Sequence, residues 1–265
     1  MKQMKYNYHT HTYRCMHALG KDEDYVKAAI AGGLVELGFS DHMPWPKVKG
    51  EHQHIRMHVS KLDNYIDSIR ALQEKYKDEI KIYVGLEAEY YKDRVSWLYK
   101  LRDKYGIDYF IFGNHFHEIE SWRNYMGTYH DRVNLCKHYY EDTVEALNTG
   151  LYSYYAHPDL FLRDLTMDDE LRETCYKICK LCKELDIPLE YNLEGLKTKK
   201  RKPLYYPRDE FWEIASEVGN KAIIGGDYHT PFDLGKDKYY AIAYEYLSSL
   251  GIEVIEKIEI SDKKN

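Results

Sequence analysis

The sequence predicts an α/β fold in which parallel strands close into a barrel. Segments typical of strands alternate with segments typical of helices, and this alternation repeats seven times along the chain. The length of 265 residues also suits a barrel, because a (β/α) barrel commonly takes about 250 residues as one domain. No linker interrupts the pattern, so we expect a single domain over residues 1–265.

The expected strands are short apolar runs, and each one ends at a side chain that can bind a metal ion or a substrate. The seven runs are residues 5–8, 34–39, 80–86, 109–112, 152–156, 187–191 and 222–225. In the same order they deliver His9, Asp41 with His42, Glu87, His115, His157, Asn192, and Asp227 with His229. A further strand is expected near residues 252–260.

Helical periodicity places a helix between successive strands. Asp22 or Asp24 is suited to begin the first helix and Gly32 to end it, because these residue types satisfy or terminate the free helix ends. Further helices are expected to begin at Ser60 and to cover residues 93–105, 131–148, 210–219 and 238–250. Another helix, capped by Thr166 or Asp168, is expected to carry the three cysteines at 175, 179 and 182. The polar stretch 47–58 is a long loop, and loops of this length often act as lids.

Composition narrows the function classes. A net charge of −6 at pH 7 gives no electrostatic reason to expect nucleic acid as a partner. No apolar run approaches the roughly 18 residues that a membrane helix needs, and the charged first residues lack the apolar core of a signal peptide. We therefore expect a cytoplasmic protein without nucleic-acid or membrane partners, and the sequence leaves its oligomeric state open.

The five cysteines are odd in number and follow no secretion signal, so we expect reduced thiols. Cys175, Cys179 and Cys182 form a CxxxCxxC pattern, which holds iron–sulfur clusters in other settings. Their helical spacing with neighbouring apolar residues instead favours a buried stripe in which cysteine acts as a small apolar residue. That stripe comprises Leu171, Cys175, Ile178, Cys182 and Leu185.

The polar side chains at the strand ends form a candidate metal site. His9 and His11 are two residues apart on a strand, so their imidazoles point the same way and can converge on one ion. In barrels the carboxyl ends of the strands form the active-site face, where the other side chains should collect. Imidazole and carboxylate donors without a thiolate suit zinc, iron or manganese with open coordination positions.

The motifs at these strand ends resemble, in order and spacing, those of the polymerase and histidinol phosphatase (PHP) family. They are His9-Thr10-His11-Thr12 followed by His17, Ser40-Asp41-His42, Gly85-Leu86-Glu87, Gly113-Asn114-His115, Ala156-His157-Pro158-Asp159 and Gly226-Asp227-Tyr228-His229. The resemblance covers essentially the whole chain. The stretches Leu189-Glu190-Tyr191-Asn192, Gly195-Leu196 and Tyr206-Pro207 look like the histidinol-phosphatase branch.

The resemblance implies a distorted seven-stranded, TIM-like (β/α) barrel, the PHP fold, with two to three divalent zinc, iron or manganese ions. It assigns His9, His11, Glu87 and Asp227 to a first ion, Glu87, His115 and His157 to a second, and His17, His42 and His229 to a third. Glu87 would bridge the first two ions, and Glu89, which faces the same way, is the rival for that role. Asp41 would orient a ligand imidazole.

The activity implied by the resemblance is hydrolysis of a phosphate monoester, in which a metal-activated water attacks phosphorus in line. In the histidinol-phosphatase branch the substrate would be L-histidinol phosphate, an intermediate of histidine biosynthesis. The expected catalytic residues are Glu87, Asp227 and His229, and the expected substrate-binding residues are Arg163, Lys197, His117 and Asn192. Lys197 stands where this branch often has arginine, which puts bidentate phosphate recognition in doubt.

Arg163 or the loop around Lys197 would grip the phosphate, and the loop 47–58 would close over the organic part. Other functions stay open at this stage. The same chemistry would serve phosphotyrosine, a nucleotide or a sugar phosphate. A metal-dependent amidohydrolase also uses an HxH pair and a final aspartate, but it would want a bridging modified lysine and would leave His17 and His42 idle. A non-catalytic metal-binding module would not need the full set of donors.

Overall fold

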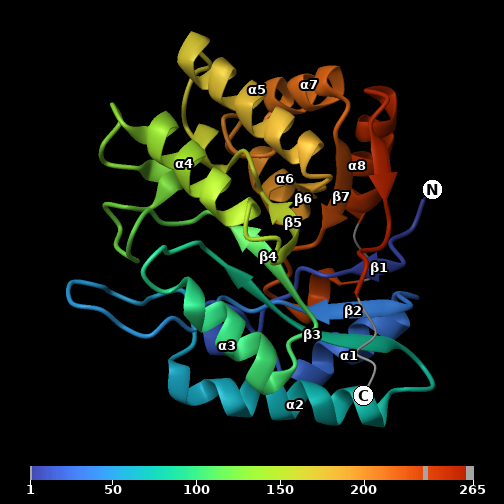
Figure 1. Cartoon of the computed structure of the whole chain (residues 1–265). Coiled ribbons are helices and arrows are strands. Elements are labelled where there is room, and N and C mark those ends of the chain that lie inside the picture. Colours follow the sequence, from blue (N-terminus) through green and yellow to red (C-terminus); the bar gives the residue numbers. More distant parts are fainter. Residues whose placement is uncertain (1, 235–237, 261–265) are drawn as a thin grey trace.

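The computed structural model describes residues 2–234 and 238–260, and within them eight parallel strands form one curled sheet (Figure 1). The strands lie in the sheet in their order along the chain, so the expected α/β barrel of parallel strands is confirmed. The seven expected strands are followed by the further strand expected near residues 252–260, which is short, so the described part of the chain has eight strands where the family resemblance implies seven. They are β1 (Tyr6–Asn7), β2 (Glu36–Phe39), β3 (Lys81–Ala88), β4 (Tyr109–Gly113), β5 (Tyr152–Ala156), β6 (Leu189–Asn192), β7 (Lys221–Gly225) and β8 (Glu253–Ile255).

The sheet closes at its carboxyl-terminal edge, where the segments that follow β1 and β7 bond to each other. The backbone N–H of His11 donates to the carbonyl oxygen of Tyr228 at 3.0 Å, and the N–H of Tyr228 donates to the carbonyl oxygen of His9 at 3.3 Å. At the opposite edge β8 pairs with the first half of β7. This closure brings the HxH segment beside the segment that carries Asp227 and His229.

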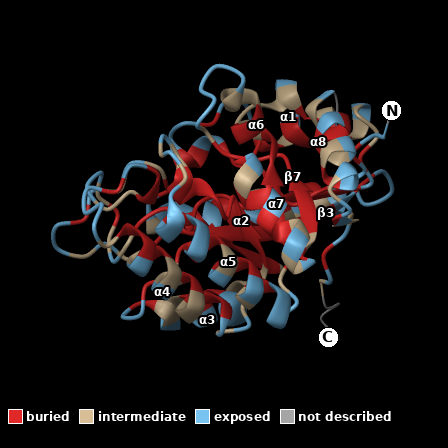
Figure 2. Cartoon of the chain, turned by 90° about the horizontal axis from the view of Figure 1, so that it is seen from above, coloured by how far each residue is buried: buried red, intermediate tan, exposed pale blue. Residues whose placement is uncertain are grey.

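Helices cover the outside of the sheet, so that buried strands lie inside a shell of partly exposed helices (Figure 2). They are α1 (Asp22–Ala31), α2 (Leu62–Lys75), α3 (Val95–Tyr105), α4 (Leu135–Leu147), α5 (Asp169–Glu184), α6 (Leu193–Lys199), α7 (Asp209–Val218) and α8 (Lys238–Ser249). Asp168 caps α5 by accepting from the N–H of Leu171 at 2.9 Å. Within residues 2–234 and 238–260, none of the helices combines the length and apolar character that a membrane crossing requires.

Helix α6 is an element that the sequence did not predict. Its seven residues span only about two turns, which is too short to show helical periodicity. The side chain of Asn192 starts the helix by accepting from the N–H of Gly195 at 2.8 Å. The residue that ends β6 therefore has a structural task in the turn from strand to helix.

Tyrosine side chains fill the inside of the barrel below the strand ends. Tyr8, Tyr83, Tyr109 and Tyr154 belong to a buried cluster separate from the one beneath the helices, together with Ile111, Ala156, Ile223 and Ile258. Tyr83 and Glu87 lie four residues apart on β3 and so point to the same face. A side chain on Gly85 would place its first carbon 2.4 Å from the ring of Tyr109, so this glycine makes room for the ring.

Helix α5 buries its cysteines. Cys175, Cys179 and Cys182 are fully buried, which confirms them as core residues. Leu185, the last member of the predicted stripe, is instead exposed because the helix ends at Glu184. Among the described residues, no group of close metal-binding donors includes these three cysteines.

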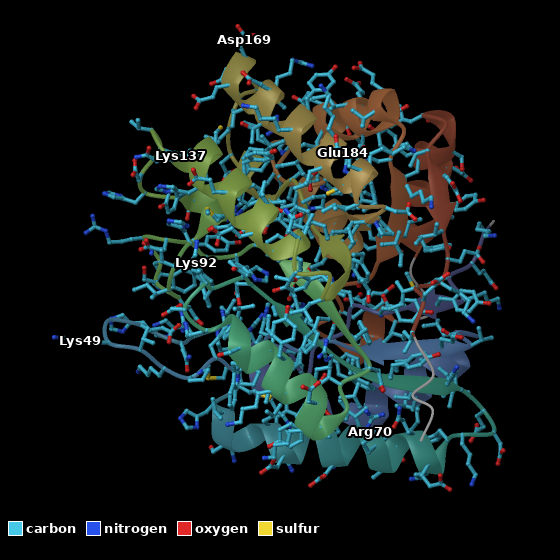
Figure 3. The ribbon with its side chains drawn as sticks, in the orientation of Figure 1. Lys49, Arg70, Lys92, Lys137, Asp169 and Glu184 are labelled. Carbon is cyan, nitrogen blue, oxygen red and sulfur yellow. The ribbon has the colours of Figure 1, made fainter. Side chains whose placement is uncertain are left out.

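The loop 47–58 is anchored more firmly than a lid would be. Lys49 lies at its tip and projects away from the barrel (Figure 3). Near the other end of the loop, Arg56 is fully buried and pairs with Glu89 at 2.7 Å. Deleting the loop would leave Glu89 charged, buried and without this partner, which is strongly destabilising. The end of the loop at Arg56 is therefore fixed in place, while Ile55 lines the pocket at the strand ends, where the loop was expected to cover the organic part of the substrate.

Replacing Cys175, Cys179 and Cys182 together by alanine should destabilise the protein without removing bound metal. Each change deletes a buried sulfur atom from packed surroundings, which costs on the order of 1 kcal/mol. Thermal unfolding and elemental analysis of the purified variant measure the two effects. Disappearance of an iron–sulfur absorbance band in the triple variant would show that the cysteines hold a cluster.

Candidate metal centre

Glu87, near the end of β3, lies at the centre of a group of histidines. One carboxylate oxygen, Oε1, lies 2.8 Å from Nε2 of His157 and 3.2 Å from Nε2 of His115. The other oxygen, Oε2, lies 3.0 Å from Nδ1 of His42 and 3.5 Å from Nε2 of His11. The two oxygens of one buried carboxylate thus face two separate groups of imidazoles, which is the geometry that a bridging ligand needs.

A first group of donors joins the HxH pair to the end of β7. Oδ1 of Asp227 lies 2.9 Å from Nε2 of His11 and 3.5 Å from Nε2 of His9. Nε2 of His9 is also 3.4 Å from Oε2 of Glu87. Closure of the barrel between β1 and β7 is what brings these side chains together.

A second group of donors, the residues expected to bind the third ion, lies at the outer side of the centre. The 3-10 turn Tyr13–Cys15 carries the chain back so that Nε2 of His17 lies 2.9 Å from Nε2 of His229. One donor atom each from His17, His42 and His229 lies within 4.8 Å of the others. His17 is exposed, so this side of the centre is open to solvent.

The backbone is strained where it turns two of these side chains inward. His157 has a φ of 33° and Asp227 a φ of 51°, both in the left-handed region that residues other than glycine rarely adopt. Such a conformation costs on the order of 1–3 kcal/mol and is typical of functional sites. At Gly113 a side chain would place its first carbon 2.4 Å from Oε1 of Glu87, so a glycine is required there.

Several donor atoms of the centre are buried and, although some lie close to one another, none of them makes a hydrogen bond of acceptable geometry. They are Nε2 of His9, both ring nitrogens of His11, Nδ1 of His42, Oε2 of Glu87 and Oδ1 of Asp227. An unsatisfied buried polar group costs about 1–3 kcal/mol, so a cluster of them needs an explanation. Imidazole and carboxylate donors that converge in this way suit divalent transition metals, and the residues present therefore fit such ions.

Without metal, burial and the neighbouring charges set different protonation states for the donors of the centre. Burial would raise the pKa of Glu87, but His115, His9 and His42 hold it well below its usual range. Burial would lower the pKa of His115, but Glu87 and Glu89 raise it to about 10. Burial and the neighbouring His11 lower the pKa of His229 to about 3, so this imidazole is neutral at physiological pH and can donate its lone pair.

Glu190, on β6, is a functional residue to which the sequence analysis gave no role. Its Oε1 lies 2.7 Å from Nδ1 of His9, and its Oε2 accepts from the N–H of His157 at 3.1 Å and from the side chain of Asn192 at 2.9 Å. A carboxylate in this position fixes the orientation of a ligand imidazole. Glu190 and Asn192 are two residues apart on a strand and so share a face, and this spacing was the available signal.

Asp41 occupies the position expected of a residue that orients ligands. Its Oδ1 lies 3.6 Å from Nδ1 of His11 and accepts from the N–H of His42 at 2.8 Å. The hydroxyl of Thr12 donates to its other oxygen. The carboxylate therefore ties the HxH segment to the end of β2.

Glu89, the rival of Glu87, lies behind the cluster. Its Oε1 is 3.1 Å from Nδ1 of His115 and 2.7 Å from Nη2 of the buried Arg56. Arg56 also pairs with Glu120, which connects the two loops beside the pocket. Because Glu89 is paired with a guanidinium on the far side of His115, the geometry favours Glu87 as the bridging carboxylate.

The centre opens into a cavity of about 230 Å³. Its walls include the apolar or aromatic side chains of Ile55, Phe116, Trp122, Tyr125 and Tyr206. Arg163 supplies the only Arg or Lys side chain among the residues that line it. The guanidinium lies 4.7 Å from the ring centre of Tyr205, and its Nε makes no hydrogen bond, although Asp164 is 3.4 Å away.

The other predicted substrate-binding residues lie elsewhere. Nδ1 of His117 is 2.8 Å from Asp142, and His117 lines a different pocket with acidic side chains. Lys197 pairs with Glu194 at 3.4 Å and also lies outside the cavity. Asn192 is fully buried, and its amide donates to Glu190 and, at 3.1 Å, to Asp227. It therefore positions two carboxylates. The strand ends bring their donor side chains together as the sequence predicts. The connections that follow the strands, however, fold away from the cavity.

Comparison with known proteins shows a match to the model of the PHP domain over residues 7–194. A protein of Deinococcus radiodurans named "Probable histidinol-phosphatase" is 28% identical over 233 residues, 86% of this chain and 87% of that protein. One of the same name from Schizosaccharomyces pombe is 27% identical over 275 residues, 95% of this chain and 88% of that protein.

A solved structure with the same fold is the histidinol phosphate phosphatase of Lactococcus lactis, in complex with zinc, L-histidinol and phosphate. The TM-score is 0.72 at 21% sequence identity, and the match covers 97% of this chain and 100% of that chain.

Replacing Glu87 by glutamine should reduce bound metal and activity more than the same change at Glu89, because only Glu87 has oxygens facing both groups of histidines. Glu89→Gln should instead lower the stability, by up to about 3–5 kcal/mol, since it leaves Arg56 buried beside a neutral group. Elemental analysis and denaturant unfolding of both variants separate the two effects. If Glu89→Gln loses the metal and Glu87→Gln keeps it, the assignment is reversed.

Proposed function

Because the chain belongs to the PHP domain family, whose model matches residues 7–194, we propose that its metal centre hydrolyses a phosphate monoester and that this substrate is L-histidinol phosphate. The observation that carries the proposal is the convergence of unpartnered imidazole and carboxylate donors on Glu87 beside a single guanidinium. The choice of substrate is supported by the names of the two curated relatives and by the L-histidinol and phosphate held in the Lactococcus lactis structure.

We propose that the centre holds two to three ions of zinc, iron or manganese. The short distances around Glu87 support it as the ligand shared by two of them, and zinc in the Lactococcus lactis structure supports the choice of metal. The catalytic role of Asp227 and His229 is to hold ions beside the reacting phosphate. The proposed ligand sets are His9, His11, Glu87 and Asp227; Glu87, His115 and His157; and His17, His42 and His229.

When bound, the ions would activate a water and take up charge on the phosphoryl oxygens. Arg163 then binds the phosphate dianion, and its stacking on Tyr205 holds the guanidinium in place for this. The rings of Trp122 and Tyr125 and the side chain of Ile55 enclose the organic part of the substrate and exclude water. Asn192 keeps Asp227 oriented toward the HxH pair.

Purified protein should hydrolyse L-histidinol phosphate faster than p-nitrophenyl phosphate, a phosphotyrosine peptide, a nucleotide or a sugar phosphate. Removal of metal by a chelator should abolish hydrolysis, and added zinc, iron or manganese should restore it, because the ions supply the nucleophile. Phosphate release measured across this panel tests both statements. Equal rates on all substrates would leave only a general phosphomonoesterase, and full activity after complete metal removal would refute the metal mechanism.

Replacing Arg163 by methionine should raise the KM for phosphate monoesters about tenfold or more, since a charge-assisted hydrogen bond can supply about 1.4 kcal/mol. Lys197→Met is the matched control, because Lys197 lies outside the cavity and should alter KM by less than about twofold. Steady-state kinetics on one substrate compare the two. A larger effect at Lys197 than at Arg163 would move the phosphate site to helix α6.

A further inference from the structure

Cys15 lies beside the outer group of histidines, although the sequence analysis excluded a thiolate from the metal site. The 3-10 turn Tyr13–Cys15 ends at Met16, whose φ of 69° turns the chain so that Sγ of Cys15 lies 4.0 Å from Nε2 of His17. The sulfur and one ring nitrogen each from His11 and His229 lie within 4.8 Å of one another. The thiol is thus part of a three-residue donor group that includes two predicted ligands.

An independent observation points to a cation at this group. Nδ1 of His17 donates to the carbonyl oxygen of Cys15 at 2.8 Å, and Nδ1 of His229 donates to that of Asp227 at 3.0 Å. In the neutral rings the two Nε2 atoms, 2.9 Å apart, therefore both carry lone pairs, and a cation bound between them would remove their repulsion. The other four cysteines lie on helices α4 and α5, outside the barrel.

We propose that Cys15 is a metal ligand that binds, as a thiolate, the ion held by His17 and His229. This inference rests on the metal centre of the proposed function and extends it. Binding forms one sulfur–metal bond and breaks one S–H bond, and the proton leaves to solvent. A thiolate among imidazoles favours zinc, cobalt or ferrous iron over manganese or magnesium, because these ions are softer.

The local geometry fits such a ligand. In a tetrahedral zinc site the bond lengths to sulfur and nitrogen place those two atoms about 3.5 Å apart, so the 4.0 Å between Cys15 and His17 needs only a small adjustment. Burial raises the pKa of the Cys15 thiol. A bound metal ion deprotonates a coordinating thiol outright.

Cobalt(II) tests the proposal, since a thiolate bound to cobalt gives a charge-transfer band in the near ultraviolet that imidazole and carboxylate ligands do not give. The cobalt-loaded protein should show this band together with visible ligand-field bands. Cys15→Ser should lose the near-ultraviolet band and keep the visible ones. Cys136→Ser, which removes a thiol from helix α4, should keep both.

Visible bands without the charge-transfer band in the unmodified protein, or a band that survives Cys15→Ser, would refute the thiolate ligand and leave the metal centre intact. Failure of cobalt to bind at all would refute the centre itself. X-ray absorption of the zinc-loaded, unmodified protein needs no variant. It should detect a sulfur neighbour at about 2.3 Å from zinc, and its absence would also refute the proposal.

Discussion

Glu87 is a buried carboxylate, and its charge has to be compensated by the side chains around it. A buried ion costs several kcal/mol unless partners surround it, so the barrel must bring those partners within reach. Four strands and the segments after them do this: His9 and His11 follow β1, His42 follows β2, and His115 and His157 follow β4 and β5. The register of the sheet, the closure between β1 and β7 and the lack of a side chain at Gly113 all help to bring these imidazoles to the carboxylate of Glu87.

Behind the donors stands a layer of carboxylates that connects the site to the rest of the fold. Glu190 fixes His9, Asp41 lies beside His11, and Glu89 lies between His115 and the buried Arg56. Each of these carboxylates orients a ring on one side and is held by backbone or side-chain donors on the other. A change in this layer therefore acts both on metal geometry and on the stability of the neighbouring loops.

The crowded imidazoles, the unsatisfied donors and the strained backbone at His157 and Asp227 are all unfavourable for the protein without metal. Ions that bind the folded chain and not the unfolded chain raise the free energy of unfolding by mass action. The increase grows with the logarithm of the ratio of the ion concentration to the dissociation constant. Metal binding and folding are consequently coupled in this protein. The buried cluster below the centre, half of whose members are tyrosines, packs beneath the strand ends and supports them.

The sequence by itself determined the order of the strands and of the longer helices, the barrel and the set of strand-end donors. These depend on local periodicity and on the rule that parallel strands present their carboxyl ends at one edge. Only the tertiary structure distinguishes Glu87 from Glu89, since both share a strand face and differ in what lies opposite: several histidines for Glu87, and Arg56 with His115 for Glu89. It also moved His117 and Lys197 out of the cavity, added Glu190 and brought Cys15 to the histidines. These outcomes depend on how the connections fold after each strand. That folding is determined by contacts between residues distant in sequence, and no local pattern encodes such contacts.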